Sequence, residues 1–117
     1  MKRDMDLIRE ILRQVEAHEK PQEWMDPQVP GRTELEVSYH VMLMDQGGLL
    51  EGMDRSAIGI FRWSARCLTW KGHELLAAAR DDNRWNQCLA AAGGGPSVNL
   101  EVLERLLVDS VTKAAAG

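Results

Sequence analysis

The segment over residues 53–72 carries the residues best suited to contact a nucleic acid. It holds one acid, Asp54, and four bases: Arg55, Arg62, Arg66 and Lys71. Four bases against one acid give it a net charge of +3 in a chain whose net charge is −4. Basic side chains bind phosphates, and arginine also suits the narrow minor groove of DNA. We therefore expect these four side chains to contact DNA; a basic edge that only discourages strand pairing is the alternative.

Histidines, cysteines and acids are present in numbers that invite a search for metal or catalytic sites. Cys67 and Cys88 are isolated thiols without Cys-x-x-Cys spacing, and we expect both to be free and buried. His73 and Glu74 are adjacent, so on a helix they point about 100° apart and do not chelate together. The glycines at 93–95 lack the Lys-Ser/Thr that follows in a phosphate loop. The sequence predicts no metal, no cofactor, no small-molecule substrate and no enzyme.

The chain contains four tryptophans but only one phenylalanine and one tyrosine. Tryptophans can stack on the bases of single-stranded nucleic acids. Because other aromatic residues are so few, we expect the tryptophans to supply the aromatic mass of the core and of the base of a hairpin. They are Trp24, Trp63, Trp70 and Trp85.

The basic segment overlaps a predicted β-hairpin, over residues 49–68. One strand is expected at 49–53 and the other at 58–63, continuing as far as 68, with Asp54-Arg55-Ser56 as the turn. Thr69 is a good N-cap for a following helix over 70–79. A basic hairpin followed by a capped helix would present its charges at one edge of the molecule.

A helix is predicted over residues 34–46, directly before the hairpin. Thr33 and Glu36 form a capping box, and Gly47-Gly48 ends the helix. The helix has two apolar stripes on nearly opposite sides, Val37, Val41 and Met44 on one and Leu35, Tyr39 and Met42 on the other. Its charges are Glu34, Glu36 and Asp45, with no lysine or arginine, so it is poorly suited to approach phosphates.

The rest of the chain completes a single domain over residues 1–117. We expect an amphipathic helix at 4–18, an irregular stretch at 21–32 with a short edge strand at 23–25, and a core that ends near residue 92. A glycine-rich hinge then leads to a last helix over 97–113, with Leu100, Leu103, Leu106, Leu107 and Val111 on one face. The expected core consists of Ile8, Ile11, Leu12, Val15, Val41, Met44, Leu49, Leu68, Leu75, Leu76, Leu103 and Leu107.

Several phrases of the sequence carry a resemblance to a known family. They are the opening Met1–Arg9, Ser38–Val41, Leu68–Glu74, Arg80–Asp82 and Trp85-Asn86. Together they resemble a family of small bacterial and prophage proteins to which no activity is assigned. That family looks winged-helix-like and is akin to the YjcQ-type proteins.

This resemblance implies an α+β winged-helix-like fold with three to five helices and a small antiparallel hairpin or three-stranded sheet. It also implies a prophage or mobile-element origin. On the helix at 34–46 it favours Val37, Val41 and Met44 as the core stripe, which leaves Leu35, Tyr39 and Met42 facing outward or meeting another element. It assigns no catalytic residue.

The location of the protein also follows from what its sequence contains. No apolar run approaches the roughly 18–20 residues that span a bilayer. The opening Met-Lys-Arg-Asp-Met-Asp has acids where a signal peptide is apolar. We expect a cytoplasmic protein that does not enter a membrane.

Two functions from different classes fit these observations. The first is a DNA-associated regulator, acting as a dimer on double-stranded DNA through Arg55, Arg62, Arg66 and Lys71, with Tyr39 reaching the groove. The second is a protein-binding module, such as a phage adaptor or inhibitor of a host protein. It would use Leu35, Tyr39 and Met42 and no nucleic acid.

Overall fold

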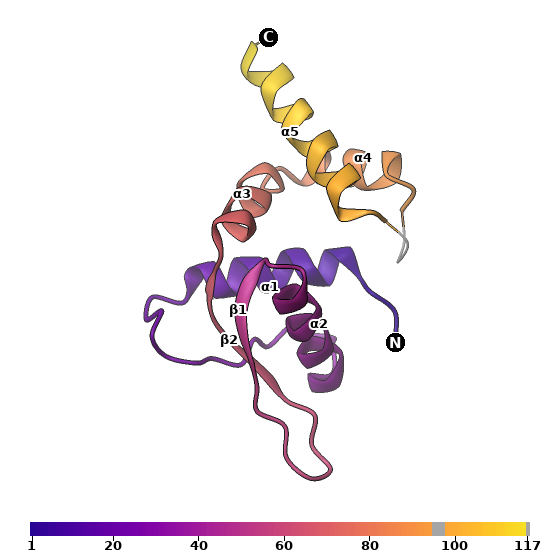
Figure 1. Cartoon of the computed structure of the whole chain (residues 1–117). Coiled ribbons are helices and arrows are strands. Elements are labelled where there is room, and N and C mark those ends of the chain that lie inside the picture. Colours follow the sequence, from indigo (N-terminus) through magenta and orange to yellow (C-terminus); the bar gives the residue numbers. More distant parts are fainter. Residues whose placement is uncertain (95–97, 117) are drawn as a thin grey trace.

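The computed structural model describes residues 1–94 and 98–116 and shows a winged-helix-like α+β fold (Figure 1). In these residues five helices accompany a two-stranded antiparallel sheet. The elements are α1 (Met5–Ala17), α2 (Glu34–Gln46), β1 (Leu50–Asp54), β2 (Trp63–Leu68), α3 (Trp70–Ala78), α4 (Asp82–Ala91) and α5 (Leu100–Ala116). α1 and α2 pack beside the hairpin, and α3, α4 and α5 lie at the end of the molecule opposite the hairpin tip.

Side-chain caps fix where the helices begin. The Asp4 carboxylate accepts hydrogen bonds from the first-turn amides of α1, and the Thr69 hydroxyl accepts one from the Gly72 amide. The Thr33 hydroxyl accepts the Glu36 amide at 3.1 Å, as the sequence predicts. The second half of that capping box differs from the prediction, because the Glu36 carboxylate accepts from the Thr33 hydroxyl at 3.3 Å. The helices at 34–46 and 70–79 are confirmed to within one residue.

The hairpin is confirmed, but its turn lies further along the chain than expected. β1 and β2 pair from Leu50↔Leu68 to Asp54↔Trp63, with a bulge next to Glu51. The chain reverses between Ala57 and Ile60, which exchange two backbone hydrogen bonds of 2.9 Å. The prediction of a turn at residues 54–56 and of a strand from residue 58 was therefore wrong. Gly59 has a positive φ of 78°, which glycine adopts without strain, and this favours the later turn.

A third chain segment pairs with the outer side of β2. Met25 forms an isolated antiparallel bridge with Ala65, with backbone hydrogen bonds of 2.8 and 2.9 Å. The predicted edge strand at 23–25 is thus reduced to one bridge. Pro27 follows two residues later and cannot donate a backbone hydrogen bond, so the pairing does not continue. This bridge places the side chains of Trp24 and Asp26 beside β2.

All twelve predicted core residues are buried. On α2 the buried stripe is Val37, Val41 and Met44, as expected from the resemblance. The expectation for the tryptophans holds only in part, because Trp85 is buried whereas Trp70 is 82% exposed. Trp70 opens α3 directly after its N-cap, on the side of the helix that faces away from Leu75 and Leu76.

Polar contacts join α4 to α1. The Arg9 guanidinium donates to the Ala79 carbonyl at 2.8 Å and to the Asp82 carboxylate at 2.5 Å. The Trp85 indole N–H donates to the Asp6 carboxylate at 2.7 Å. Because these bonds link the opening of the chain to residues 79–85, the phrases Met1–Arg9 and Arg80–Asp82 act mainly in holding the fold together.

The last helix is confirmed, with one correction to its buried face. Leu103 and Leu107 are fully buried, whereas Val111, expected on the same face, is 36% exposed. Figure 1 shows the C-terminal part of α5 extending beyond α3 and α4. Asn99 caps it by accepting the Val102 amide. Gly95 and Pro96 of the predicted glycine-rich hinge, and Ser97, where the last helix was expected to begin, lie outside the described residues.

Candidate interaction surfaces

The outward face of α2 carries an uncharged apolar surface, here called the α2 surface: Leu35, Tyr39 and Met42. Leu35 is 51% exposed, and Tyr39 and Met42 are half-buried. The structure thus places the three predicted interface residues together, facing away from the core stripe of the same helix. Leu43, also half-buried, extends this surface by one side chain that sequence reasoning missed.

The tyrosine of the α2 surface is held in place by its neighbour. The rings of Tyr39 and His40 meet edge to face, with centroids 5.8 Å apart and planes at 80°. His40 is buried and is itself fixed by two hydrogen bonds, to the Glu36 carbonyl and from the Asp4 amide, both of 2.8 Å. A ring that is already ordered loses little conformational freedom on contact with a partner.

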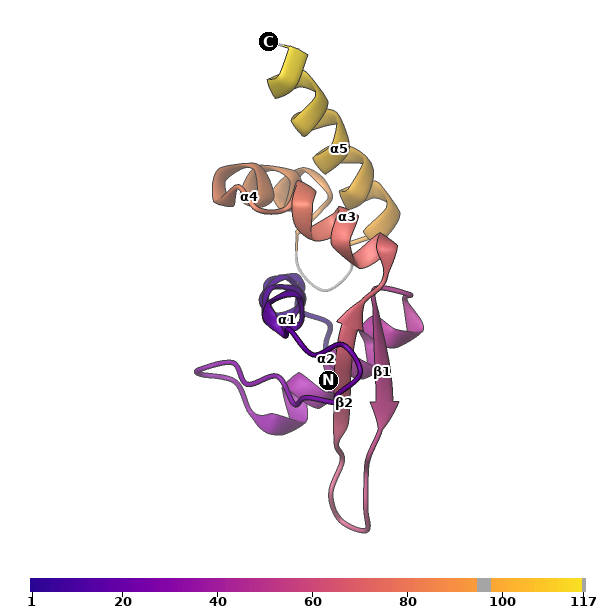
Figure 2. The ribbon, with the colours of Figure 1, turned by 90° about the vertical axis from the view of Figure 1, so that its left-hand side faces the viewer.

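The hairpin tip is also apolar. Ile58 is fully exposed, Ile60 is 61% exposed and Phe61 is 39% exposed. Figure 2 shows this tip projecting well beyond α1 and α2. The sequence analysis missed these residues as a surface because it assigned them to a strand of the sheet. Their exposure follows from the turn at 57–60, which leaves them with no strand or helix to cover them.

A groove of about 110 Å³ connects the α2 side to the hairpin. It is bordered by Glu34 and Ser38 of α2 and by Ile60, Phe61 and Trp63 of the hairpin arm. Glu34 and Ser38 are the sequence neighbours of Leu35 and Tyr39, so the groove lies next to the α2 surface. A partner that covers the α2 surface therefore has the hairpin arm within reach.

Two of the four basic residues predicted to contact DNA form ion pairs with carboxylates. The first of them is Arg62. Its guanidinium donates to Asp26 at 2.6 and 2.9 Å, and the Ser64 hydroxyl also donates to that carboxylate. Burial raises the pKa of Asp26, but the hydrogen bonds from Arg62 and Ser64 outweigh it and lower the pKa below its ordinary value. Asp26 is therefore an anion at neutral pH and neutralises Arg62.

Arg66 of β2 also forms an ion pair with a carboxylate, that of Glu51. It donates to Glu51 at 2.8 Å, and its guanidinium carbon lies 4.8 Å from the centroid of the Trp24 ring. The hydrogen bond from Arg66 lowers the pKa of Glu51. The nearby Cys67 thiol, which is only half-buried and not buried as expected, has a raised pKa because of burial and the Glu51 charge.

Arg55 and Lys71 differ from these two arginines. Both are exposed, and neither forms an ion pair within residues 1–94 and 98–116. Adding Asp26 and Glu51 to the basic segment lowers its net charge from +3 to +1 (four bases and three acids). The basic surface is thus weaker than the sequence indicates. Exposed ion pairs contribute only about 0–1 kcal/mol each, so a phosphate would still compete with these carboxylates.

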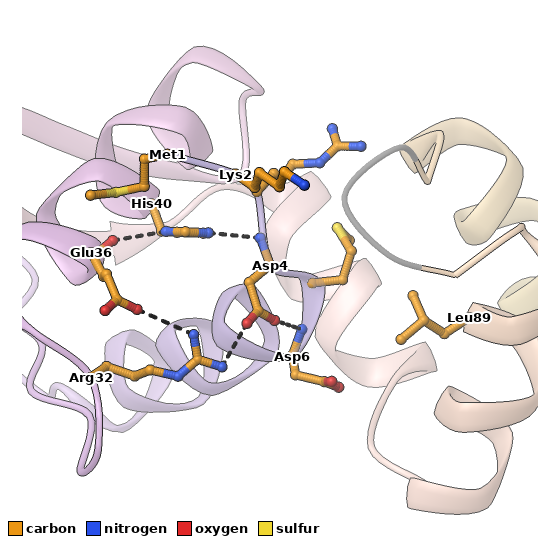
Figure 3. A pocket seen from close by; sticks show the side chains of 10 residues that line it. Met1, Lys2, Asp4, Asp6, Arg32, Glu36, His40 and Leu89 are labelled. Atoms are coloured by element: carbon orange, nitrogen blue, oxygen red, sulfur yellow. Dashed lines mark hydrogen bonds and ion pairs between the residues drawn. The ribbon is translucent and has the colours of Figure 1, made fainter.

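A hollow of about 440 Å³ lies where the N-terminal residues meet the start of α2 (Figure 3). Arg32 bridges Asp4 at 2.6 Å and Glu36 at 3.4 Å. Burial raises the pKa of Asp4, but hydrogen bonds from Arg32 and the α1 amides lower it overall. Both ring nitrogens of His40 bind backbone groups, so neither is available as a general base. This hollow is better explained as the junction that anchors α1 than as a catalytic site.

Among the residues that the structure describes, no group of three or more His, Cys, Asp or Glu side chains is placed to hold a metal ion. None of the described helices has the length and apolar character needed to cross a membrane.

Comparison with known proteins adds the family. Residues 2–97 match the model of the family described as "Hypothetical protein (DUF2513)". The chain is similar to an uncharacterised protein of Haemophilus influenzae, 41% identical over 87 residues, which is 74% of each chain. No solved structure matches the chain. Since the family model spans most of the chain, from α1 to the end of α4, the protein belongs to the DUF2513 family.

Proposed function

We propose that this protein is a non-enzymatic protein-binding module that uses the α2 surface together with the adjoining hairpin arm. The observation that carries the proposal is the outward face of α2, where Leu35 is exposed and Tyr39 and Met42 are half-buried although the core already has its own stripe on the opposite side. A surface helix normally turns charged residues to solvent, and an apolar outward face is typical of a contact site.

The charges around this surface favour one kind of partner. Glu34 stands near one end of the α2 surface and Asp45 near the other, and α2 has no lysine or arginine. The whole chain has a net charge of −4. We therefore expect a partner protein with an apolar contact flanked by lysine or arginine. Two antiparallel copies of α2 fit less well, since the acid at each end would face another acid.

Site-specific photocrosslinking tests the proposal directly. A photoreactive phenylalanine analogue replaces Leu35, and in a control variant it replaces the exposed Gln87 of α4. After irradiation of cells that encode the protein, we expect a discrete adduct from position 35 that protease destroys and nuclease leaves intact. An equal adduct from position 87, or none from position 35, would contradict the proposal.

Binding to DNA is the second candidate, favoured by one observation on the hairpin. The exposed Arg55 lies next to the apolar tip residues Ile58 and Ile60. Proteins that enter the minor groove combine arginine with apolar wedges in this way. In this alternative Arg62, Arg66 and Lys71 would add phosphate contacts and Tyr39 would reach the groove. A nuclease-sensitive adduct in the crosslinking experiment would favour it.

Two expectations that follow from the family resemblance agree with this proposal. A kinship with the winged-helix proteins of the YjcQ type and an origin in a prophage both suit a small module that docks on a host or phage protein. A cytoplasmic location suits either candidate function.

A further inference from the structure

The outer edge of the second hairpin arm is only partly paired. The Ala65 N–H and C=O point to this edge and bond to Met25. Further along the arm, the carbonyls of Arg62 and Ile60 accept hydrogen bonds from the first arm of the hairpin. Backbone groups alternate between the two edges of a strand, so the N–H and C=O groups of the residues between, at 61 and 63, point outward as those of Ala65 do.

The outward groups of Phe61 and Trp63 form an open strand edge. Within residues 1–94 and 98–116 no hydrogen bond reaches them. An edge with free N–H and C=O groups is a template on which another extended chain can pair. The structure therefore leaves room for one more strand beside the hairpin arm, directly after the bridge formed by Met25.

Proline explains why the chain does not fill this edge itself. If the antiparallel pairing of Met25 with Ala65 continued, Pro27 would lie opposite Trp63. Pro27 has no N–H to donate to the Trp63 carbonyl, and the chain leaves β2 and continues to the start of α2 (Figure 1). The open edge is thus a consequence of the sequence at one position.

The shape of the neighbouring groove favours an extended occupant. The groove of about 110 Å³ is lined by Phe61 and Trp63 of the arm, by Pro27, and by Glu34 and Ser38 of α2. An α-helix with its side chains is about 10–12 Å across and is too wide for it. An added strand needs only about 4.7–4.9 Å beside the arm, and it can turn one side chain into the groove.

The charges that line the groove favour a basic side chain. Glu34 is exposed and forms no ion pair in the part of the chain that the structure describes. Asp26, the other acid of the groove, is already paired with Arg62. Two acids and one base leave the groove with a net charge of −1. A second copy of this chain would bring the same unpaired acid, so it is a poorer occupant than a basic segment.

We propose that the open edge at Phe61 and Trp63 binds an extended segment of a partner protein as an added strand, with a lysine or arginine of that segment directed at Glu34. This inference rests on the proposed function and names the kind of segment by which the partner is held. Backbone hydrogen bonds supply affinity in this mode of recognition, and side chains at alternate positions supply specificity.

Short random linear peptides displayed on phage and selected on the whole protein provide the probe. We expect selected sequences with apolar residues at alternate positions and a lysine or arginine. Fluorescence anisotropy then compares Phe61→Pro with Phe61→Ala, which both lose the ring, whereas only the proline variant loses the N–H. Phe61 lies outside the β1–β2 ladder, so neither variant breaks it. Phe61→Pro should bind the peptide at least about tenfold more weakly than Phe61→Ala.

Two further readouts test the charge and the backbone pairing. Glu34→Gln should weaken peptide binding about threefold, as for loss of an exposed ion pair, whereas Glu101→Gln on α5 should leave it unchanged. In hydrogen exchange the Trp63 amide should exchange freely in the protein alone and become protected when the peptide is bound. Circular dichroism checks the fold of every variant.

Several results would overturn the inference: no selected peptide, equal binding by Phe61→Pro and Phe61→Ala, or a bound peptide that leaves the Trp63 amide unprotected. Protection of this amide in the protein alone that disappears on dilution would assign the edge to a second copy instead. The crosslink from position 35 tests the α2 surface and does not require strand pairing. Failure of this inference and failure of the proposed function are therefore distinguishable.

Discussion

Single residues of the Leu68–Glu74 phrase show which parts of a sequence pattern serve the fold and which are free for function. The Thr69 hydroxyl accepts the Gly72 amide and donates to the Gly48 carbonyl at 2.6 Å. A side chain at Gly72 would begin 2.0 Å from the Leu49 carbonyl oxygen. Thr69 and Gly72 are therefore explained by the close approach of α3 to the start of the hairpin. Trp70 is not explained in this way, because its side chain is 82% exposed and does not take part in that contact.

The close approach at Gly72 gives the first prediction. Gly72→Ala should lower the free energy of unfolding by about 2–4 kcal/mol, because the new methyl group overlaps a backbone oxygen that cannot move alone. Urea denaturation followed by circular dichroism measures this loss. Lys71→Ala, at the exposed neighbouring position, is the control and should change the free energy by less than about 0.5 kcal/mol. Equal stability of both variants would show that α3 does not approach the hairpin as described.

The carboxylate of Asp4 gives the second prediction, a dependence of stability on pH. Its pKa in the folded protein lies below the ordinary value of 3.8. Burial raises this pKa, but the hydrogen bonds from Arg32 and the α1 amides lower it by more. A lowered pKa contributes stability that is fully present above the ordinary value and is lost as the pH falls through the folded value. Asp4→Asn should therefore destabilise the protein at pH 7 and flatten the fall in stability below pH of about 4.

Thermal unfolding of Asp4→Asn and of the parent protein between neutral and acidic pH measures this effect. The difference in melting temperature between them should shrink steadily as the pH falls. A difference that is the same at every pH would mean that the Asp4 charge does not stabilise α1.

At the scale of elements, the capping residues and glycines next to the helix ends were enough to predict α2 and α3. Contacts between residues far apart in the chain could not be predicted from the local sequence. The ends of α2 follow from Thr33 and Gly47, because a cap and a glycine act on their immediate neighbours. The turn of the hairpin was misplaced because Asp54-Arg55-Ser56 has turn composition, whereas the Gly59 φ and the Ala57–Ile60 bonds set the actual reversal.

The basic surface shows the same limit of sequence reasoning. Arg62 is paired by Asp26, which lies 36 positions earlier in the chain, and Arg66 stacks on Trp24 from the same segment. No spacing rule links residues so far apart. The one available signal was the predicted edge strand at 23–25, which would have placed these residues beside β2 had its partner strand been known.

The hairpin arginines provide the third prediction, which concerns the DNA candidate. Fluorescence anisotropy on random-sequence duplex DNA should show little binding even at low salt, because Asp26 and Glu51 offset two of the four bases. Binding that falls steeply with the logarithm of salt concentration would favour the DNA candidate instead. In that case Arg62→Ala with Arg66→Ala should flatten the slope, and an unchanged slope would remove the hairpin from the DNA contact.

At the scale of the whole molecule, the proposed partner-binding surface lies within the part of the chain that matches the family. The α2 surface and the hairpin arm are apolar with acids near the edges, which suits a partner of opposite charge. Residues 2–97, which match the family, include the α2 surface, whereas α5 lies beyond them. The α2 surface is therefore part of the family domain.

The most direct measurement of the central claim uses the partner identified by the crosslink from position 35. Its dissociation constant is measured by calorimetry with the parent protein, with Tyr39→Ala/Met42→Ala and with Arg62→Ala/Arg66→Ala. We predict that the α2 double variant binds at least about thirtyfold more weakly, as expected for loss of an aromatic anchor worth about 2 kcal/mol, while the arginine variant keeps its affinity. If the α2 variant, still folded by circular dichroism, binds as tightly as the parent protein, the α2 surface is not the interface.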